Sequence, residues 1–482
     1  MSATCRWVPR GADAGHGKEA TDMRSPLGLR ARTSFPLILA CLYLLVLWLA
    51  GGASRADALG QVVVRAASWT MLIVVALAQP RATLDSARPI ALLIGASILL
   101  ALLQLVPLPP ELWQALPGRA LFAQAADLSG QPQPWRPLAI VPGAAINAAG
   151  SLVVPVAMLV LLIGLEPQER PRLVGIMLGL VVASTLVGLL QFSGAGFDNL
   201  LINDTVGEVS GTFANRNHFA LFVAVGCLLA PVWAFVEDRR PGWRAPVSVG
   251  LILLFTLTIL ASGSRAGMAI GILALGTGLL LVQQGIRRTL RRYPRWVFPA
   301  LIAAIVIAIG VLVLISIAAD RAISIQRAIA VDAEQDMRSR GLPTVLAMVR
   351  EYWPWGSGLG GFDPLFRINE PFGLLKPTYF NHAHNDLIEV VLDAGLPGLL
   401  LLVAALVWWA AASVRAWRAG AGVHHALPKL GSAILLFVIL ASAFDYPART
   451  PLMMATIVIA AMWLSESGSR GSRALPRNGQ YL

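Results

Sequence analysis

The sequence is poor in charged residues, which occupy only 13% of its 482 positions. Soluble globular domains carry roughly a quarter charged residues, and dividing this chain into smaller soluble domains would raise that share. Apolar residues instead make up 56% of the chain, about 270 positions, and the mean hydropathy is +0.69. A membrane helix needs about 20 mostly apolar residues, so this supply suits about twelve spans. The composition excludes a water-soluble protein and predicts an all-α, polytopic integral membrane protein.

Cysteine and lysine are also scarce. Of three cysteines, Cys5 lies in a polar tail and Cys41 and Cys227 lie in apolar runs, which excludes a disulfide framework or a cysteine metal cluster. Only three of the 38 basic residues are lysines, a bias that we attribute to genome base composition. The net charge of +12 lies in short clusters between apolar runs rather than on one solvated face. No nucleic-acid partner is therefore expected.

Twelve apolar runs are long enough to be membrane spans. Residues 1–34 before them are polar without apolar period, which predicts a disordered tail. The first run lacks a small-residue cleavage site and precedes further spans, so we interpret it as a transmembrane helix rather than a signal peptide. The second contains Arg65, which can snorkel to the headgroups from near a helix end. The predicted spans are 35–52, 60–79, 89–107, 146–165, 172–192, 217–236, 246–262, 266–284, 296–317, 387–412, 430–446 and 451–465.

Basic residues divide unevenly between alternate loops, and this bias sets the orientation of a membrane protein. With the N-terminus inside, the cytoplasmic segments hold 24 of the 38 Lys and Arg residues, whereas the short outer loops hold at most two each. The outer loop 318–386 carries seven, but at about 69 residues it is long enough to be translocated regardless of charge. Both termini, including the tail 467–482, are therefore predicted to be cytoplasmic.

Two outer loops are the longest segments between the predicted spans. Loop 108–145 is rich in proline and tryptophan, and we expect it to lie at the membrane interface, where aromatic rings prefer to sit. Within loop 318–386, the stretch from Arg338 to Tyr352 has the apolar spacing of a short amphipathic helix, and Pro354 follows it. The non-helical sequence is thus concentrated outside.

Ionisable residues at the outer ends of the spans are the candidates for chemistry, because charge at membrane depth is costly. They are Arg216 in the segment GTFANRNHFA, Arg265 in the turn SGSRAG and His384 in the stretch FNHAHND. Two guanidinium forks can hold a pyrophosphate without a metal, and histidine can remove a proton near neutral pH. These three residues would suit a site that holds a phosphorylated lipid beside an acceptor hydroxyl. Interfacial anchoring by the arginines and a structural histidine remain alternatives.

The spacing that follows His384 is specific. His384-Asn385, nine residues and then Gly395-Leu396-Pro397-Gly398 resemble the signature of the O-antigen ligase family of bacterial membrane glycosyltransferases. The next residue in that family is usually Val, Thr or Ile, whereas here it is Leu399. The segments GTFANRNHFA, SGSRAG and PWGSGLGGF are similar to further family motifs and occur in the family's order, with the Phe of the last one shifted. The resemblance covers roughly 205–405.

This resemblance implies a C-type glycosyltransferase-like fold with a long periplasmic loop between spans 9 and 10. It divides the chain into N-terminal helices 35–204, a catalytic region 205–412 and C-terminal helices 413–466. It implies that the protein transfers a glycan from undecaprenyl pyrophosphate to an acceptor hydroxyl at the periplasmic face of the bacterial inner membrane, without metal or cofactor. His384 would be the general base, and Arg216 and Arg265 would bind the pyrophosphate. Direct attack by the acceptor would invert the anomeric centre.

Several neighbours are candidates for supporting roles. His382 shares a face with His384 in an extended segment but not in a helix. Asn385 and Asp386 could orient the base, although we favour capping of the tenth helix. The run Gly356 to Gly361 has the glycines of a nucleotide loop but no Gly-Lys-Ser/Thr ending, which excludes that function.

Four further residues have weaker claims. Asn215 and Asn217 are expected to bond the backbone or Arg216. Arg338 and Arg340 could meet phosphate or sugar, but we favour solvated loop charge.

The acceptor is left open by the sequence. A lipid A core hydroxyl, as in an O-antigen ligase, is our first hypothesis. Polymerisation of repeat units and transfer to protein hydroxyls are alternatives within the family. A transporter or flippase of lipid-linked sugars is an alternative of another class, but transporters usually hold their charges near the membrane midplane, whereas these cluster at one surface.

Overall fold

The computed structural model describes residues 34–290 and 333–469 apart from 79–83, 85–86, 195–198, 203–207, 236–241, 376–379 and 421–424, together with positions 294, 296, 303 and 307. These residues are almost entirely helical. The strands among them are β1 (Pro107–Leu108) and β2 (Arg136–Pro137), an antiparallel pair. The predicted all-α class is confirmed.

Seven helices in the described part of the chain are long and apolar enough to cross a membrane. They are α2 (Leu59–Ala78), the consecutive α6 (Pro142–Ser151) and α7 (Val153–Ile163), which count as one span, α8 (Arg172–Phe192), α9 (Arg216–Phe235), α10 (Arg244–Ser262), α11 (Arg265–Leu290) and α16 (Asp386–Arg418). Shorter apolar helices are α1 (Phe35–Ala50), α3 (Arg88–Leu103), α17 (Ala426–Ser442) and α18 (Pro451–Ser469). Together they match eleven of the predicted spans, and the ninth, 296–317, lies outside the described residues apart from isolated positions.

Helix α9 lies at the centre of the bundle. It packs against α8, α10, α11 and α17, and 89% of the residues in its most apolar 18-residue stretch are buried. Peripheral helices instead expose large apolar side chains, such as Leu77 on α2 (84% exposed) and Leu92 on α3 (64%). An apolar exterior around an apolar core is what a lipid solvent requires.

Arg65, in α2, does not snorkel outward as the sequence suggested. Its Nη2 donates to the side-chain oxygen of Asn147 on α6 at 2.6 Å and to the carbonyl of the same residue at 3.2 Å. The guanidinium satisfies part of its hydrogen-bonding capacity inside the bundle, where it links α2 to α6.

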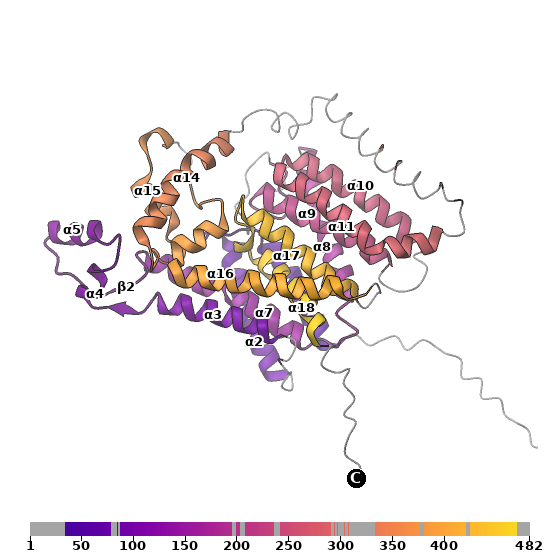
Figure 1. Cartoon of the computed structure of the whole chain (residues 1–482), viewed down its shortest axis with the longest axis horizontal. Helices are drawn as coiled ribbons and strands as arrows, with labels where there is room; N and C mark the ends of the chain where they lie inside the picture. Colours follow the sequence, from indigo (N-terminus) through magenta and orange to yellow (C-terminus); the bar gives the residue numbers. More distant parts are fainter. Residues whose placement is uncertain are drawn as a thin grey trace, which may run out of the picture.

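One end of the bundle carries four helices, α4 (Pro110–Gln114), α5 (Ala120–Leu128), α14 (Ala333–Tyr352) and α15 (Phe362–Asn369) (Figure 1). Two 3₁₀ turns are η1 (Phe372–Leu374), after α15, and η3 (Pro447–Arg449), between α17 and α18. Helix α14 confirms the predicted amphipathic helix, because its buried Val345 and Met348 join Phe362, Phe366 and Phe380 in a separate apolar core. We call α14, α15 and this core the lobe.

A kink in α16 receives the glycine-rich segment that precedes α15. Gly395 has φ 56°, and a Cβ there would lie 2.0 Å from the carbonyl oxygen of Pro354. Two backbone hydrogen bonds join the segments here. The Leu396 amide donates to the Pro354 carbonyl at 2.7 Å, and the Gly358 amide donates to the Asp393 carbonyl at 2.9 Å. The Gly-x-x-Gly part of the signature therefore joins α16 to the lobe.

Arg119 fastens the loop between α4 and α5 to the same segment. Its side chain is 1% exposed and donates to the carbonyls of Pro117, Leu138 and Gly356 at 2.8–3.0 Å. Burial lowers the pKa of Arg119 to about 10, so the guanidinium is still charged at neutral pH. This loop is thus a structural brace for the lobe.

Candidate active site

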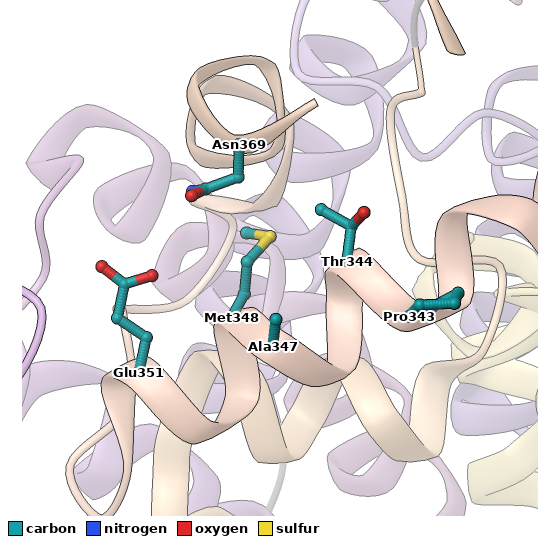
Figure 2. A pocket seen from close by; sticks show the side chains of 6 residues that line it. All are labelled: Pro343, Thr344, Ala347, Met348, Glu351 and Asn369. Atoms are coloured by element: carbon teal, nitrogen blue, oxygen red, sulfur yellow. The ribbon is translucent and has the colours of Figure 1, made fainter. Parts of the chain in front are cut away.

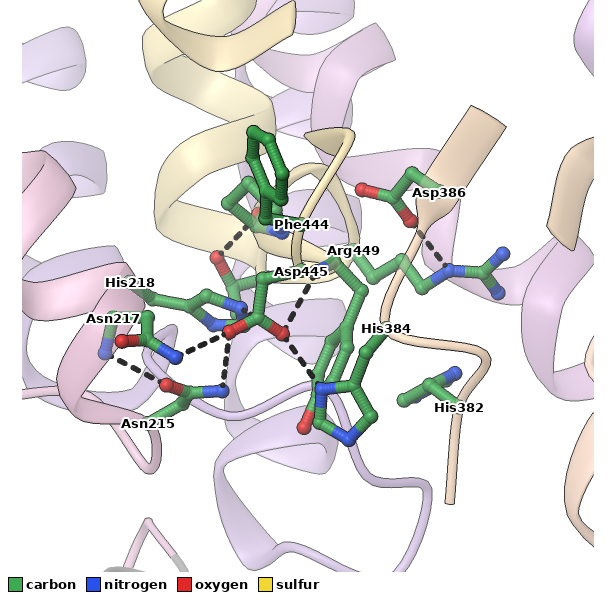
Figure 3. A network of polar contacts seen from close by, with 12 residues as sticks. Asn215, Asn217, His218, His382, His384, Asp386, Phe444, Asp445 and Arg449 are labelled. Carbon is green, nitrogen blue, oxygen red and sulfur yellow. Dashed lines mark hydrogen bonds and ion pairs between the residues drawn. The ribbon is translucent and has the colours of Figure 1, made fainter. Parts of the chain in front are cut away.

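His384 and the two asparagines Asn215 and Asn217 meet at a carboxylate that the sequence did not indicate, Asp445 (Figure 3). Asp445 lies between α17 and α18 and is 3% exposed. Its Oδ1 lies 3.1 Å from His384 Nδ1 and accepts the Tyr446 amide at 3.0 Å. Its Oδ2 accepts the side-chain amides of Asn217 at 2.7 Å and Asn215 at 3.3 Å. Segments more than 200 residues apart in the sequence therefore meet at one side chain.

The charge state of Asp445 fixes the tautomer of His384. Burial alone would raise the pKa of Asp445, but its contacts with the imidazoles of His218 and His384 outweigh burial and hold that pKa well below its usual range. An ionised carboxylate only accepts hydrogen bonds, so Nδ1 of His384 must carry the proton that it shares. In the neutral imidazole the lone pair then resides on Nε2, which is the arrangement of an oriented general base.

His384 has an unusual backbone conformation. Its φ is 50°, and it is the one non-glycine residue with positive φ in the described part of the chain. A side chain in this region costs about 1–2 kcal/mol, and such strain tends to gather at functional sites. The conformation is maintained by neighbours on both sides, since Ala383 donates its amide to Glu389 at 2.7 Å and Asn385 caps α16 through the Ile388 amide at 3.1 Å.

Asn215 and Asn217 have more defined roles than the sequence suggested. Asn215 caps α9, because its Oδ1 accepts the Asn217 amide at 2.7 Å while its Nδ2 reaches Asp445. The two side-chain amides therefore tie the start of α9 to the carboxylate that contacts His384. The contact of Asn215 with the Asn217 amide is the kind of backbone bond that the sequence predicts. The bond to Asp445 could not be foreseen because it joins residues about 230 positions apart.

Arg216 and Arg265 are each the first residue of a helix, α9 and α11. These helices pack closely at that end, because a Cβ on Gly267 would lie 2.4 Å from the Cβ of Ala220. Ser264 fixes the start of α11 by accepting the Gly267 amide at 3.0 Å. Arg216 is 8% exposed and lies 3.3 Å from Glu208, whereas Arg265 is half-buried. Two helix N-termini and two guanidinium groups thus concentrate positive potential in one region.

A second histidine–carboxylate pair lies beside the first. His382 Nδ1 is 2.9 Å from Glu389 Oε1, so His382 is positioned next to His384 with a partner of its own. Glu389 is fully buried and shares its charge with Arg449 at 3.1 Å. Arg449 also contacts Asp386 at 2.9 Å and Asp393 at 3.8 Å. One guanidinium therefore holds three carboxylates along one face of α16.

The carboxylates keep Arg449 charged and in place. Burial would lower the pKa of Arg449, but the neighbouring Glu389, Asp386 and Asp393 outweigh it and raise that pKa above its usual value. Asp386 also accepts the hydroxyl of Ser442 at 3.1 Å. The network joins the start of α16 to α17 and η3, and it supports the segment that contains His384.

Tyr446 separates the histidines. Its ring centroid lies 4.3 Å from that of His382, 5.0 Å from that of His384 and 4.9 Å from that of His218. Burial and the nearby charge of Asp445 raise the pKa of Tyr446, which keeps the phenol neutral. The ring packs against the imidazoles and so restricts the orientation of their planes.

Of the remaining candidate residues, some contact the site around Asp445 and others do not. Arg338 on α14 lies 3.7 Å from Asp445 Oδ2 and donates to the Phe444 carbonyl at 3.3 Å, so it belongs to the site rather than to solvated loop charge. Arg340 is exposed and donates to the Gly373 carbonyl at 3.0 Å, a lobe contact. Asn385 caps α16 as expected, and Asp386 pairs with Arg449 instead of His384.

The sequence reading missed Asp445, Glu389, Arg449, Tyr446 and His218 as members of the site. One signal could have found the first of them. The short turn between the last two spans contains an acid and an arginine close to membrane depth, where charge by default indicates function.

Part of the chain is similar to a known protein family. Residues 249–403 match a family described as O-antigen ligase. The matched region contains Arg265, His384 and the Gly-x-x-Gly kink of α16, whereas Arg216 and Asp445 lie outside it. No curated protein matches the chain. The protein is a multi-pass helical membrane protein whose residues 249–403 are similar to the O-antigen ligase family.

Proposed function

We propose that the protein is a glycosyltransferase that moves a glycan from undecaprenyl pyrophosphate to an acceptor hydroxyl on the periplasmic side of the inner membrane, as an O-antigen ligase. The observation that carries this proposal is the contact of His384 Nδ1 with Asp445 Oδ1 at 3.1 Å, which leaves Nε2 to act as a base. The family match and the two arginines at neighbouring helix starts support the choice of donor.

The reaction is a direct displacement. The acceptor oxygen forms a bond to the anomeric carbon while the bond from that carbon to the pyrophosphate oxygen breaks, and the electron pair leaves with the pyrophosphate. The acceptor proton passes to His384 Nε2, and Asp445 stabilises the imidazolium that forms. Attack from the side opposite the leaving group inverts the anomeric configuration.

Arg216 and Arg265 are proposed to bind the pyrophosphate. A guanidinium matches phosphate oxygens with two parallel hydrogen bonds, and an N-terminal helix dipole adds attraction for an anion. Glu208 lies 3.3 Å from Arg216, and a phosphate oxygen would take its place beside the guanidinium when the donor binds. Arg216→Lys and Arg265→Lys keep the charge but lose the fork, and activity unchanged in both would indicate plain anchoring.

The test uses the purified full-length protein in proteoliposomes with a lipid-linked glycan donor. His384→Ala and His384→Gln are expected to lower the rate of transfer at least 100-fold with unchanged protein levels, because general-base catalysis contributes about 10²–10⁴. His425→Gln is the matched control, since His425 precedes α17 at the end of that helix opposite Asp445. Transfer at near wild-type rate by both His384 variants would refute the base assignment.

The acceptor is identified in the host. Deletion of the gene is expected to abolish glycan attachment to lipopolysaccharide while full-length lipid-linked glycan accumulates. Loss of a secreted polysaccharide with accumulation of single repeat units would indicate a polymerase instead, and loss of a glycoprotein would indicate a protein oligosaccharyltransferase.

A further inference from the structure

An open surface pocket of about 340 Å³, which we call the cavity, lies in the lobe between α14 and the end of α15 (Figure 2). Thr344, Met348 and Glu351 project into it from one face of α14, and Asn369 faces them from the end of α15. Pro343 and Ala347 complete the lining. This volume lies at the lower end of the range of small-ligand sites, roughly 300–1,000 Å³.

The lining combines hydrogen-bonding groups with an apolar floor. A hydroxyl, a carboxylate and an amide stand beside Ala347, Met348 and Pro343, and none of the six lining residues is basic. The carboxylate of Glu351 would repel a phosphate, so the cavity is unsuited to the anionic part of a lipid-linked donor. Side chains of these types bind the hydroxyl groups of sugars, while the apolar atoms can accept the C–H face of a pyranose ring.

Two of the lining residues are held by contacts with the rest of the lobe. Met348 is 1% exposed and belongs to the apolar core formed with Tyr352, Phe362 and Phe366. Asn369 is held by a hydrogen bond from its Nδ2 to the Leu365 carbonyl at 3.0 Å. A site whose groups are fixed before binding loses less entropy when a ligand enters.

Helix α14 connects the cavity to the candidate active site. Arg338 on this helix lies 3.7 Å from Asp445, which contacts His384. At a rise of 1.5 Å per residue, Thr344 lies about 9 Å and Glu351 about 20 Å along the helix from Arg338. A single sugar cannot span this distance, but a short oligosaccharide that starts at the reacting centre can.

We propose that this cavity is a glycan subsite, which binds sugar units several residues away from the reacting end of a saccharide chain. The inference rests on the proposed glycosyl transfer and adds a determinant of glycan length. The chain could belong to the donor or to the acceptor, because both present the same hydroxyl-rich chemistry, and the experiment separates the two.

The experiment fills the cavity without changing its charge. Ala347→Phe places a ring inside it, and Leu346→Phe places the same ring on the neighbouring, 39% exposed position outside its lining. Steady-state transfer is measured with the full-length protein in proteoliposomes, using donors with a complete glycan or only its first sugar and acceptors with a complete or truncated saccharide. Ala347→Phe is expected to raise KM about tenfold for the complete form of one substrate and to leave the truncated form unchanged.

The substrate whose KM rises identifies the glycan that occupies the cavity. Leu346→Phe is expected to match the wild type in every arm. An unchanged KM in all arms, or an equal rise for complete and truncated substrates, would overturn the subsite. If Ala347→Phe does not fold, Thr344→Val and Glu351→Gln, which remove single hydrogen-bonding groups, are measured in its place with the same criteria.

Direct binding separates this proposal from the proposed function. The reducing oligosaccharide released from the lipid-linked donor, and the free saccharide of the acceptor, are titrated into the protein in detergent. The wild type is expected to bind one of them and Ala347→Phe to bind neither, whether or not glycan transfer is detected. Equal binding of both to wild type and variant, or binding of neither, would refute the subsite, whereas absence of transfer by the wild type would refute only the reaction.

Discussion

Asp445→Asn tests the central contact of the site while preserving its shape. The carboxylate lies 3.1 Å from His384 Nδ1, and at an effective dielectric constant of about 20 its attraction for an imidazolium is about 5 kcal/mol. Asp445 is shared with Arg338 at 3.7 Å and His218 at 3.7 Å, so we expect about half of this stabilisation to be lost from the transition state. A loss of about 3 kcal/mol corresponds to a fall in kcat of about 10²-fold.

The substitution also changes the hydrogen-bond pattern. An asparagine amide can donate to Nδ1, which would move the ring proton to Nε2 and remove the base from part of the population. The KM for the donor is expected to stay near the wild-type value, because Asp445 is assigned no contact with the pyrophosphate. This split between kcat and KM distinguishes a positioning role from a general loss of structure.

The assay is initial-rate glycan transfer at saturating donor and acceptor, with the folded fraction checked by thermal unfolding in detergent. Asp363→Asn is the matched control, because Asp363 forms a surface ion pair with Arg367 four residues later on α15, and such pairs contribute little. A kcat for folded Asp445→Asn within threefold of the wild type would refute the orientation of His384 by this carboxylate.

Three further predictions concern the supporting structure. Gly267→Ala places a methyl group 2.4 Å from Ala220 Cβ and should separate the starts of α9 and α11, raising the donor KM severalfold; Gly276→Ala on the same helix meets nothing within 4 Å and should behave as wild type. Identical KM values for both variants would exclude this packing role. Arg449→Met leaves three carboxylates without their cation and should lower stability by about 3–5 kcal/mol, measured as the unfolding midpoint in detergent, with a smaller loss for Arg449→Lys. An unchanged midpoint would show that the charges are compensated elsewhere. Because the pKa of Asp445 is depressed in the folded state, its ionisation stabilises the fold above the unfolded value of about 3.9, and this contribution is lost as pH falls through the folded value. The difference in melting temperature between wild type and Asp445→Asn should therefore shrink as pH falls below about 4, and a difference that stays constant from about pH 5 down to the acid limit of folding would contradict the assignment.

Most helices could be predicted because lipid-facing and buried helices are both apolar, so an unbroken run marks them. The predicted span 172–192 coincides with α8. The predicted span 146–165 is confirmed as one span, but it consists of two consecutive helices, α6 and α7, with a break at Leu152. Pro155 has no amide to donate to the carbonyl four residues earlier, which accounts for the interruption.

The site was only partly predictable, for a different reason. His384, Arg216 and Arg265 were found because each belongs to a local pattern that the sequence displays directly. Asp445 meets His384 across 61 positions and Asn215 across 230, and such contacts depend on the packing of α9, α16 and α17 rather than on spacing. Local motifs indicate which residues are candidates for the chemistry, but not the partners that hold them.

The position of Asp445 outside the matched residues 249–403 has a consequence for protein engineering. A chimera that exchanged only residues 249–403 with those of a similar protein would replace His384 without replacing Asp445 and Arg449. It would also leave the two asparagines at the start of α9 unchanged. Such a hybrid could insert and fold yet lack an oriented imidazole. A chimera designed to change the proposed substrate preference should therefore include the start of α9 and the turn between α17 and α18 together with residues 249–403.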